Sequence, residues 1–444
     1  MEKNTIKKTA ALIRSGQVSV KEILDESLLK IKRNAVDSGF VICDERGALE
    51  SADAAEKRIT LGEMCELLGI CYSVSDNILT EGLAACAGSR MLSGFVPSYS
   101  ATVHSRLAQK GAVMVGKTCV SEFSVRGDSP DGEKLSHGSA RSVALGEVLF
   151  SLCTDTGGEA LLSALRYSIV GVKPTSNRVS RHGVVSHSPR FDSVSIIANT
   201  VSDAALVFSA VSGKDGYDVT VKDEAEMPIE LGCDVSSLKI AVIDEMLHGV
   251  SDECRSRFEN VCDNIIGMGA RIDHVSVQSI RYAPHVWKAI SSAESSSILA
   301  RYDGVRGGYK ADGDFSNITE FYQKTRGEGF GSDIKKKILL GTYLLGEDGR
   351  DILLRSEKIY SDISSDVDAL FSDYDFIISA VSAHMTHDNA LSALPNICGL
   401  CAVVLPSADR SFSGVELMGK GSCDHALLSF AHTVNRVMGG EDDI

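Results

Sequence analysis

Thr154-Asp155-Thr156-Gly157-Gly158-Glu159 is a tight turn that contains two adjacent glycines and closes a segment of small residues. Glycine lets a backbone turn sharply and approach a ligand closely, so the N–H groups of such a turn can point at one anion or oxyanion. A run with helix-compatible composition follows from Ala160 to Leu165. We therefore take this turn as the first candidate for a functional site.

The strands and helices that surround the turn are predicted from residue spacing. Ser19 followed by Glu22 is a capping-box pattern at the start of a long helix. Strand-like runs at Leu238–Ile243 and Arg271–Val277 enclose a helical pattern, which predicts a β-α-β unit. Because such strands and helices alternate along the whole chain, the sequence predicts an α/β fold with a mixed or mostly parallel sheet.

The segment Gly111–Thr118 has the glycine, lysine and threonine spacing of a phosphate-binding loop. In that kind of loop the residues between the glycines must be flexible, whereas here they are apolar and favour a strand. We therefore expect a buried strand at this place and no nucleotide site.

The composition limits the class of protein. The chain has 444 residues, with no proline-rich, serine-rich or like-charge linker, so we expect one domain over 1–444 with a more helical subdomain around 280–375. A net charge of −15 argues against free-standing nucleic-acid binding, because a phosphate backbone attracts a basic surface. No signal region and no apolar run of about 20 residues is present, so we expect a cytoplasmic protein that does not enter a membrane.

Twelve cysteines are scattered along the chain without the spacing of a disulfide framework. Cys398 and Cys401 form one C-x-x-C pair, with no second pair or histidine at zinc spacing. His384 and His387 are three residues apart, but no third ligand lies within reach in the sequence. We expect reduced, mostly buried thiols, no metal and no cofactor.

Several segments occur in the order and with the spacing of one family of enzymes. They are Gly69-Ile70, Ser75-Asp76-Asn77-Ile78, Ala101-Thr102-Val103, Gly116-Lys117-Thr118, Glu122-Phe123, Thr154 to Gly158, Val170 to Thr175 and Arg178 to Gly183. Together they resemble the amidase signature family. Two later stretches, Ala300–Arg306 and Glu328–Gly331, resemble in particular the A subunits of tRNA-dependent amidotransferases.

The resemblance implies an amidase signature fold, in which helices cover both faces of a large mixed sheet. It also implies carboxamide cleavage by a serine nucleophile, a bridging serine and a lysine. A lysine kept neutral by burial takes the proton through the bridging serine, and the N–H groups of the turn stabilise the oxyanion. In the tRNA-dependent system, partners of the B and C type would complete the assembly, and only a partner would contact tRNA.

Each catalytic position of that family carries a different residue in this chain. The lysine position falls on Ser75, the bridging serine position on Leu135 and the nucleophile position on Glu159. The oxyanion loop itself is kept as Thr156, Gly157 and Gly158. Because a carboxylate at position 159 would tend to fill or oppose the oxyanion hole, we expect no meaningful amidase or glutaminase activity.

The substrate-binding positions are altered as well. The basic residue that would hold a substrate carboxylate falls within Lys335–Lys337, with Lys336 and Lys337 as candidates. An acidic residue that would hold an ammonium group falls on Asp388 or Asn389. A lysine attracts an anion but does not make the planar bidentate contact of arginine.

Three functional hypotheses follow. The first is a catalytically inactive amidase-fold protein that acts as a scaffold, regulator or binding module. The alternative is a working amidotransferase subunit, or an amidase with rearranged chemistry that uses Glu159, Asp76 or Ser136. The third is a sensor that binds an amino acid or an amide in the old pocket.

Overall fold

The computed structural model describes residues 4–35, 37–125, 138–222, 229–381, 393–407 and 413–440. In these ranges one eleven-stranded sheet runs through the molecule in the order β1-β3-β2-β4-β6-β5-β10-β11-β9-β7-β8. Its strands are β1 (Phe40–Cys43), β2 (Cys71–Ser75), β3 (Val113–Thr118), β4 (Phe150–Asp155), β5 (Val170–Lys173), β6 (Ser193–Ala198), β7 (Lys239–Ile243), β8 (Arg271–Val275), β9 (Phe376–Val381), β10 (Cys401–Pro406) and β11 (Gly414–Gly419).

The sheet is mixed. β2 pairs in parallel with β3 and β4, and β7 pairs in parallel with β8 and β9, while the strands between these two groups pair antiparallel. Every residue of β2, β3, β4 and β6 is buried. Strands are buried in this way when helices cover both faces of a sheet. The predicted α/β fold is therefore confirmed.

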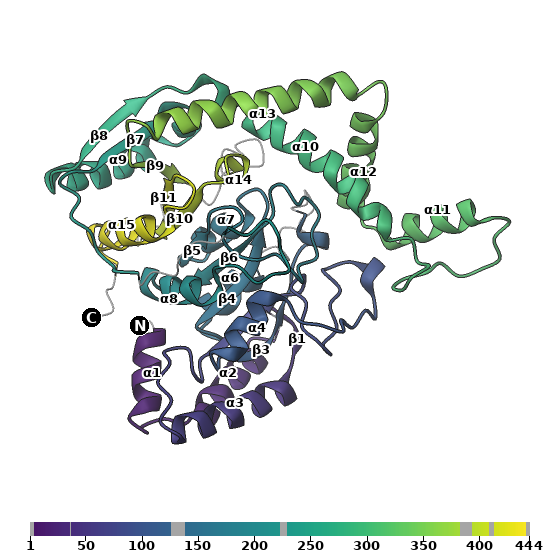
Figure 1. Cartoon of the computed structure of the whole chain (residues 1–444), viewed down its shortest axis with the longest axis horizontal. Coiled ribbons are helices and arrows are strands. Elements are labelled where there is room, and N and C mark those ends of the chain that lie inside the picture. The colour runs from purple at the N-terminus through teal and green to yellow at the C-terminus, as the bar shows by residue number, and fades with distance from the viewer. Residues whose placement is uncertain are drawn as a thin grey trace.

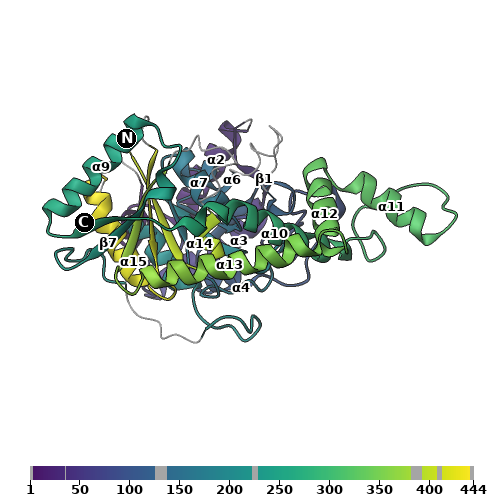
Figure 2. The same cartoon turned by 90° about the horizontal axis from the view of Figure 1, so that it is seen from above.

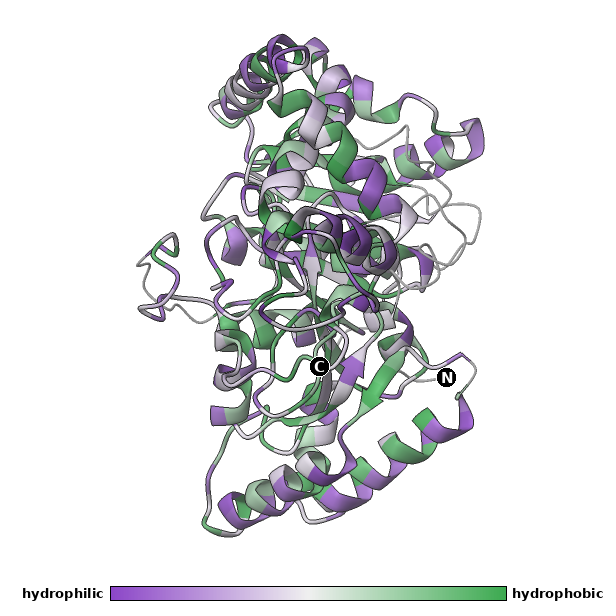
Figure 3. Ribbon diagram, turned by 90° about the vertical axis from the view of Figure 1, so that its right-hand side faces the viewer, coloured by the Kyte–Doolittle hydropathy of each residue, from purple (hydrophilic) through white to green (hydrophobic). Residues whose placement is uncertain are grey.

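The helices surround this sheet (Figure 1). They are α1 (Ile6–Arg14), α2 (Val20–Arg33), α3 (Glu45–Thr60), α4 (Thr102–Gln109), α6 (Gly138–Ala144), α7 (Glu159–Arg166), α8 (Val201–Val211), α9 (Asp252–Gly267), α10 (Ala283–Ile298), α11 (Ile318–Gly329), α12 (Ser332–Leu345), α13 (Arg350–Leu370), α14 (Leu394–Ile397) and α15 (Asp424–Val437). Figure 3 shows hydrophobic residues concentrated in the strands, whereas peripheral helices carry both hydrophobic and hydrophilic residues. Within the described ranges, no helix combines the length and the apolar composition needed to cross a membrane.

Local sequence signals account for several elements. The capping box predicted at Ser19 and Glu22 is present at the start of α2, with both of its hydrogen bonds formed. The strand predicted within Gly111–Thr118 is β3, which is buried throughout. The predicted β-α-β unit is β7, α9 and β8, whose two strands pair in parallel.

The helices α10 to α13 fall within the region 280–375 that was predicted to be more helical. Figures 1 and 2 show α11 projecting from the body of the molecule, beyond α12. A second apolar cluster, which includes Met91, Phe123, Phe330 and Ile334, packs this region against the body. That residues 280–375 form a subdomain stays a prediction.

Candidate functional site

The glycine turn links the end of β4 to the start of α7, and Asp155 holds it in place. Gly158 adopts a φ of 90° at the N-cap of α7, where glycine is favoured and where no side chain is available to cap the helix. Asp155 supplies the acceptors instead. Its Oδ1 accepts from the N–H of Gly158 at 2.8 Å, and its Oδ2 accepts from the N–H of Ala160 at 2.9 Å. The first turn of α7 is therefore anchored by the last residue of β4.

Glu159 turns its carboxyl group back onto the same turn. Its Oε2 accepts hydrogen bonds from the backbone N–H of Thr156 at 3.0 Å and from that of Gly157 at 2.8 Å. The residue is only 9% exposed. Two neighbouring N–H groups aimed at one oxygen are the arrangement of an oxyanion hole. In this chain both of these N–H groups are occupied by the carboxyl group of Glu159.

The environment of Glu159 opposes its ionisation. Burial raises the pKa of Glu159 and the nearby charge of Asp155 raises it further, while the N–H donors of Thr156 and Gly157 act in the opposite direction. The net direction is upward. The two hydrogen bonds offset part of the free-energy cost of burying this carboxyl group.

Thr156 is fixed by its side chain and its carbonyl as well as by its N–H group. Its Oγ1 donates to Oδ1 of Asp192 at 2.6 Å, and its carbonyl oxygen accepts from Nε1 of Trp287 at 2.8 Å. A Cβ atom on Gly157 would lie 2.5 Å from Trp287 Cζ2. The indole ring of α10 therefore covers the turn at close range, and only glycine fits beneath it.

Lys337 is the candidate binding lysine that the structure brings to this turn. Its Nζ lies 3.0 Å from Ser291 Oγ and 4.8 Å from the ring centre of Trp287. Burial lowers the pKa of Lys337 to about 8, although the carboxyl groups of Glu159 and Asp192 favour its charged form. Lys336 is placed differently, because its side chain is 66% exposed and lies 3.4 Å from Asp333.

Ser75, at the predicted lysine position, takes part in a buried network of hydroxyl and amide groups. Its Oγ donates to Oδ1 of Asn77 at 2.6 Å, and Nδ2 of Asn77 donates to Thr154 Oγ1 at 2.8 Å. Ser124 Oγ lies 2.7 Å from Thr154 Oγ1. None of these four side chains is a base near neutral pH. The network can position groups but cannot accept the proton of a nucleophile.

Lys117, on the neighbouring strand, does not place a basic group beside Ser75. Lys117 on β3 is paired with Val74, whereas Ser75 is paired with Thr118, so Lys117 and Ser75 lie on opposite faces of the sheet. Burial lowers the pKa of Lys117 to about 8, against the effect of Asp76. Asp76 itself accepts a hydrogen bond from the backbone N–H of Cys86 at 3.0 Å, which holds the loop that carries Cys86.

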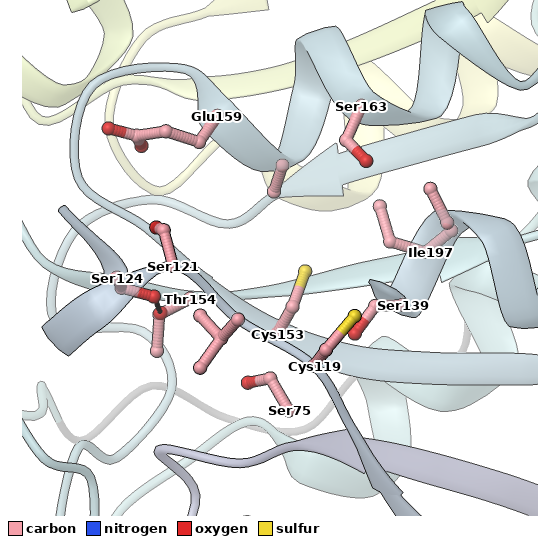
Figure 4. A pocket seen from close by; sticks show the side chains of 13 residues that line it. Ser75, Cys119, Ser121, Ser124, Ser139, Cys153, Thr154, Glu159, Ser163 and Ile197 are labelled. Carbon is pink, nitrogen blue, oxygen red and sulfur yellow. Dashed lines mark hydrogen bonds between the residues drawn. The ribbon is translucent and has the colours of Figure 1, made fainter. Parts of the chain in front are cut away.

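A cavity of about 20 Å³ lies between these groups. Figure 4 shows Glu159 at the start of α7, and Ser75 on the other side of Thr154 and Cys153. A cavity needs roughly 10–15 Å³ to hold one water molecule. This one therefore has room for about one water molecule and is too small for an amino acid.

A second group of ionisable side chains is buried beyond Asp155. Lys173 Nζ donates to the carbonyl oxygens of Leu400 at 2.8 Å and Pro174 at 3.1 Å. Burial raises the pKa of Glu416 to about 8; the charge of Asp155 raises it further, and Lys173 opposes the shift. No hydrogen bond of the described residues involves Oε1 of Glu416.

The remaining predicted residues fall in two groups. Leu135, Ser136, His384, His387, Asp388 and Asn389 lie outside the described residues. Cys398 and Cys401 are both free thiols, and burial raises the pKa of Cys398 to about 12. In the part of the chain that the structure describes, no group of three or more His, Cys, Asp or Glu side chains could hold a metal ion.

Sequence reasoning did not find Trp287, Asp192 or the Asn77 network. Trp287 is the single tryptophan of the chain, which was the one available signal for it. Its contact with Thr156 joins residues 131 positions apart. Patterns of residue spacing do not reveal contacts between residues so far apart in the sequence.

Comparisons with known proteins agree with this architecture. The family profile described as Amidase matches residues 22–130 and 136–398. The A subunit of glutamyl-tRNA(Gln) amidotransferase from Macrococcus caseolyticus (strain JCSC5402) is 30% identical, covering 98% of this chain and 97% of that protein. The protein of the same name from Lysinibacillus sphaericus (strain C3-41) is 33% identical, covering 96% of this chain and 94% of that protein.

Solved structures support the fold. The peptide amidase of Stenotrophomonas maltophilia superimposes with a TM-score of 0.82 at 19% identity, covering 99% of this chain and 98% of that one. At this identity the likeness concerns the fold alone. Together with the family match over most of the length, it confirms the resemblance read from the motifs: the chain belongs to the amidase family and is similar to the A subunit of glutamyl-tRNA(Gln) amidotransferase.

Proposed function

We propose that this chain is the A-type subunit of an amidotransferase-like assembly, and that it does not release ammonia from glutamine by serine chemistry. Ammonia would reach the assembly from another source. The observation that carries this proposal is the carboxyl group of Glu159, which accepts from the N–H groups of Thr156 and Gly157. A tetrahedral intermediate would need the same two donors.

The surrounding groups support the same conclusion about chemistry. Ser75 donates to Asn77 and has no basic partner in the described network, and Lys117 lies on the opposite face of the sheet. Loss of the nucleophile or base of a comparable serine hydrolase lowers turnover by about a millionfold. The rate that remains after such a loss depends in part on the oxyanion donors. Here those donors, the N–H groups of Thr156 and Gly157, are occupied by Glu159.

The similarity of the whole chain favours a working role in an assembly over an isolated scaffold or regulator. Relatives that carry the A-subunit name align over nearly the full length of both proteins, so the alignment leaves out no large part of either. We propose partners of the B and C type, with tRNA bound only through a partner. The net charge of −15 agrees with this, because an acidic protein does not attract the phosphate backbone of tRNA by itself.

A sensor of amino acids is supported less well. The cavity between Ser75 and Glu159 measures about 20 Å³, which accommodates about one water molecule and no amino acid.

The experiment separates the two parts of the proposal. The chain is co-purified with B-type and C-type subunits, and amidation of misacylated tRNA is measured with glutamine and, separately, with ammonium chloride. We expect product with ammonium chloride and none above background with glutamine. The homologous protein of Lysinibacillus sphaericus, tested in the same assembly, is the positive control for glutamine.

Two results would contradict the proposal. Glutamine-dependent product that disappears in Glu159→Ala would show that position 159 supports hydrolysis after all. Failure to co-purify with any partner, together with no product from ammonium chloride, would remove the proposed role in an assembly and leave the scaffold hypothesis.

A further inference from the structure

A groove of about 600 Å³ opens on the surface near α4, and its lining residues do not overlap with those of the cavity at Glu159. Ligand pockets in proteins commonly measure about 300–1,000 Å³. The groove is lined by three aromatic rings and several polar side chains, including those of Ser105 and Gln109. None of these residues takes part in the site described above.

The three rings form one continuous stack. Tyr99 and His182 lie 5.1 Å apart between ring centres at an interplanar angle of 25°, and His182 and Tyr217 lie 4.5 Å apart at 16°. Tyr217 is nevertheless 71% exposed, and Tyr99 is 45% exposed. His182 stacks on one face of the Tyr217 ring, and most of the Tyr217 residue is exposed to solvent. This exposure allows a flat ligand ring to continue the stack.

Asp215 holds the loop that carries Tyr217 against α4. Its carboxylate accepts from the backbone N–H of Tyr217 at 2.9 Å and from the side chains of Thr102 and Ser180. Burial alone would raise the pKa of Asp215, but the hydrogen bonds from Ser180 and Thr102 lower it, and the net direction is downward. Asp215 therefore stays charged and keeps these hydrogen bonds at physiological pH.

Arg106 ties the same loop to α4 from the other side. Its guanidinium group donates to the carbonyl oxygens of Val211, Ser212 and Lys214. The aromatic stack is thus placed on a fixed backbone. A preorganised surface loses little conformational entropy when a ligand binds.

Two polar side chains in the groove remain available to a ligand. Among the hydrogen bonds of the described residues, none uses Ser105 Oγ or the side-chain amide of Gln109, and both residues line the groove. They are four positions apart on α4, so they share one face of the helix. A glutamine amide presents one acceptor and two donors, which match the edge of a nucleobase.

We propose that this groove binds the nucleobase of a nucleoside or nucleotide, with the base stacked on Tyr217 and its edge directed to Gln109 and Ser105. A phenyl ring would leave these polar groups unpaired, which is costly when they lose water. A quaternary ammonium ion prefers rings that enclose it, whereas here the rings stand in a row. The acidic net charge favours a single base over a long polyanion.

Saturation-transfer NMR titrations of the full chain with adenosine, cytidine, guanosine and uridine test the proposal. Stacking of a base on an aromatic side chain is worth about 5- to 150-fold in affinity. We expect saturable binding of at least one nucleoside, weakened by a factor in that range in Tyr217→Ala and kept in Tyr217→Phe. Tyr282→Ala is the matched control, because Tyr282 is 55% exposed and does not line the groove.

The same titrations with adenosine monophosphate and with a short single-stranded oligoadenylate identify the source of the base. Equal affinity for nucleoside and monophosphate indicates a free nucleoside or nucleotide. The affinity for the oligoadenylate is compared with the affinity for adenosine. If it is higher by a factor larger than the number of bases, and this gain is lost in Tyr217→Ala, the base belongs to RNA. The proposal is wrong if no nucleoside binds saturably, or if Tyr217→Ala and Tyr282→Ala behave alike.

Discussion

Lys337 on α12 and Trp287 on α10 form a cation–π contact, with Nζ 4.8 Å from the centre of the ring. The same ring covers Gly157 and donates to the carbonyl oxygen of Thr156. Helices α10 and α12, from a distant part of the chain, are thereby packed over the turn that precedes α7.

Lys337→Met should change the pH dependence of stability. The pKa of Lys337 is about 8 in the folded protein, against 10.5 as its ordinary value. Between these values the unfolded chain binds more protons than the folded one, so stability rises with pH through that window. We expect the rise to shrink in Lys337→Met and to persist in Lys336→Met, since Lys336 is 66% exposed. Urea unfolding at about pH 8 and at about pH 10.5 measures it, and equal slopes in both variants would contradict it.

Glu159→Gln should be more stable than Glu159→Ala by about 1–3 kcal/mol, because alanine leaves the N–H groups of Thr156 and Gly157 buried without an acceptor. Glutamine keeps an oxygen in that place. Urea denaturation at neutral pH compares the two. Glu253→Ala, on the exposed side of α9, serves as the control and should change little. Equal stability of the Gln and Ala variants would show that water replaces the carboxyl group at no cost.

Gly157→Ala should destabilise the fold by about 1–3 kcal/mol, because the added Cβ meets Trp287 at 2.5 Å. The loss should be smaller when Trp287→Ala is already present, and the difference is the coupling between the two positions. Gly327→Ala is the control. It lies in α11 with no atom within 4 Å of an added Cβ, so alanine should stabilise that helix slightly. Additive effects of Gly157→Ala and Trp287→Ala would contradict the close contact.

Glu416→Gln should stabilise the protein increasingly as the pH rises. The pKa of Glu416 is about 8 in the folded protein, against 4.5 as its ordinary value. The unfolded chain therefore releases this proton first, and the native protein loses stability from about pH 4.5 to about pH 8, on the order of a few kcal/mol. Glutamine does not titrate, so the difference between variant and native protein should grow through that window. A difference that does not vary with pH would contradict the prediction.

The sequence predicted the parts of the fold that local patterns encode. The capping box at Ser19, the strand within Gly111–Thr118 and the β-α-β unit around α9 all depend on residues close together in the chain. The order of the eleven strands does not, because β5 pairs with β10 and β11 pairs with β9 across long separations. Periodicity identifies a strand but not its partner.

For the candidate site, too, the sequence predicted a local contact but not the long-range ones. The motif comparison placed Glu159 on the turn, and its carboxyl group does accept from Thr156 and Gly157. The ring of Trp287 over Gly157 could not be predicted, since it depends on how α10 packs in three dimensions. The comparison also gave no basis for choosing between Lys336 and Lys337, which helix geometry separates into a solvent-facing and an inward-facing side chain.

The carboxyl group of Glu159 is covalently tethered to the turn that binds it, and this has a pharmacological consequence. A tethered group acts at an effective concentration that reaches roughly millimolar values even with a short flexible linker. Here the link is a single side chain on α7, held two and three residues from its donors. Soluble carboxylates and inhibitors that imitate an oxyanion must compete with it. Compounds developed against intact amidases should therefore spare this protein, which makes it a selectivity control for such compounds.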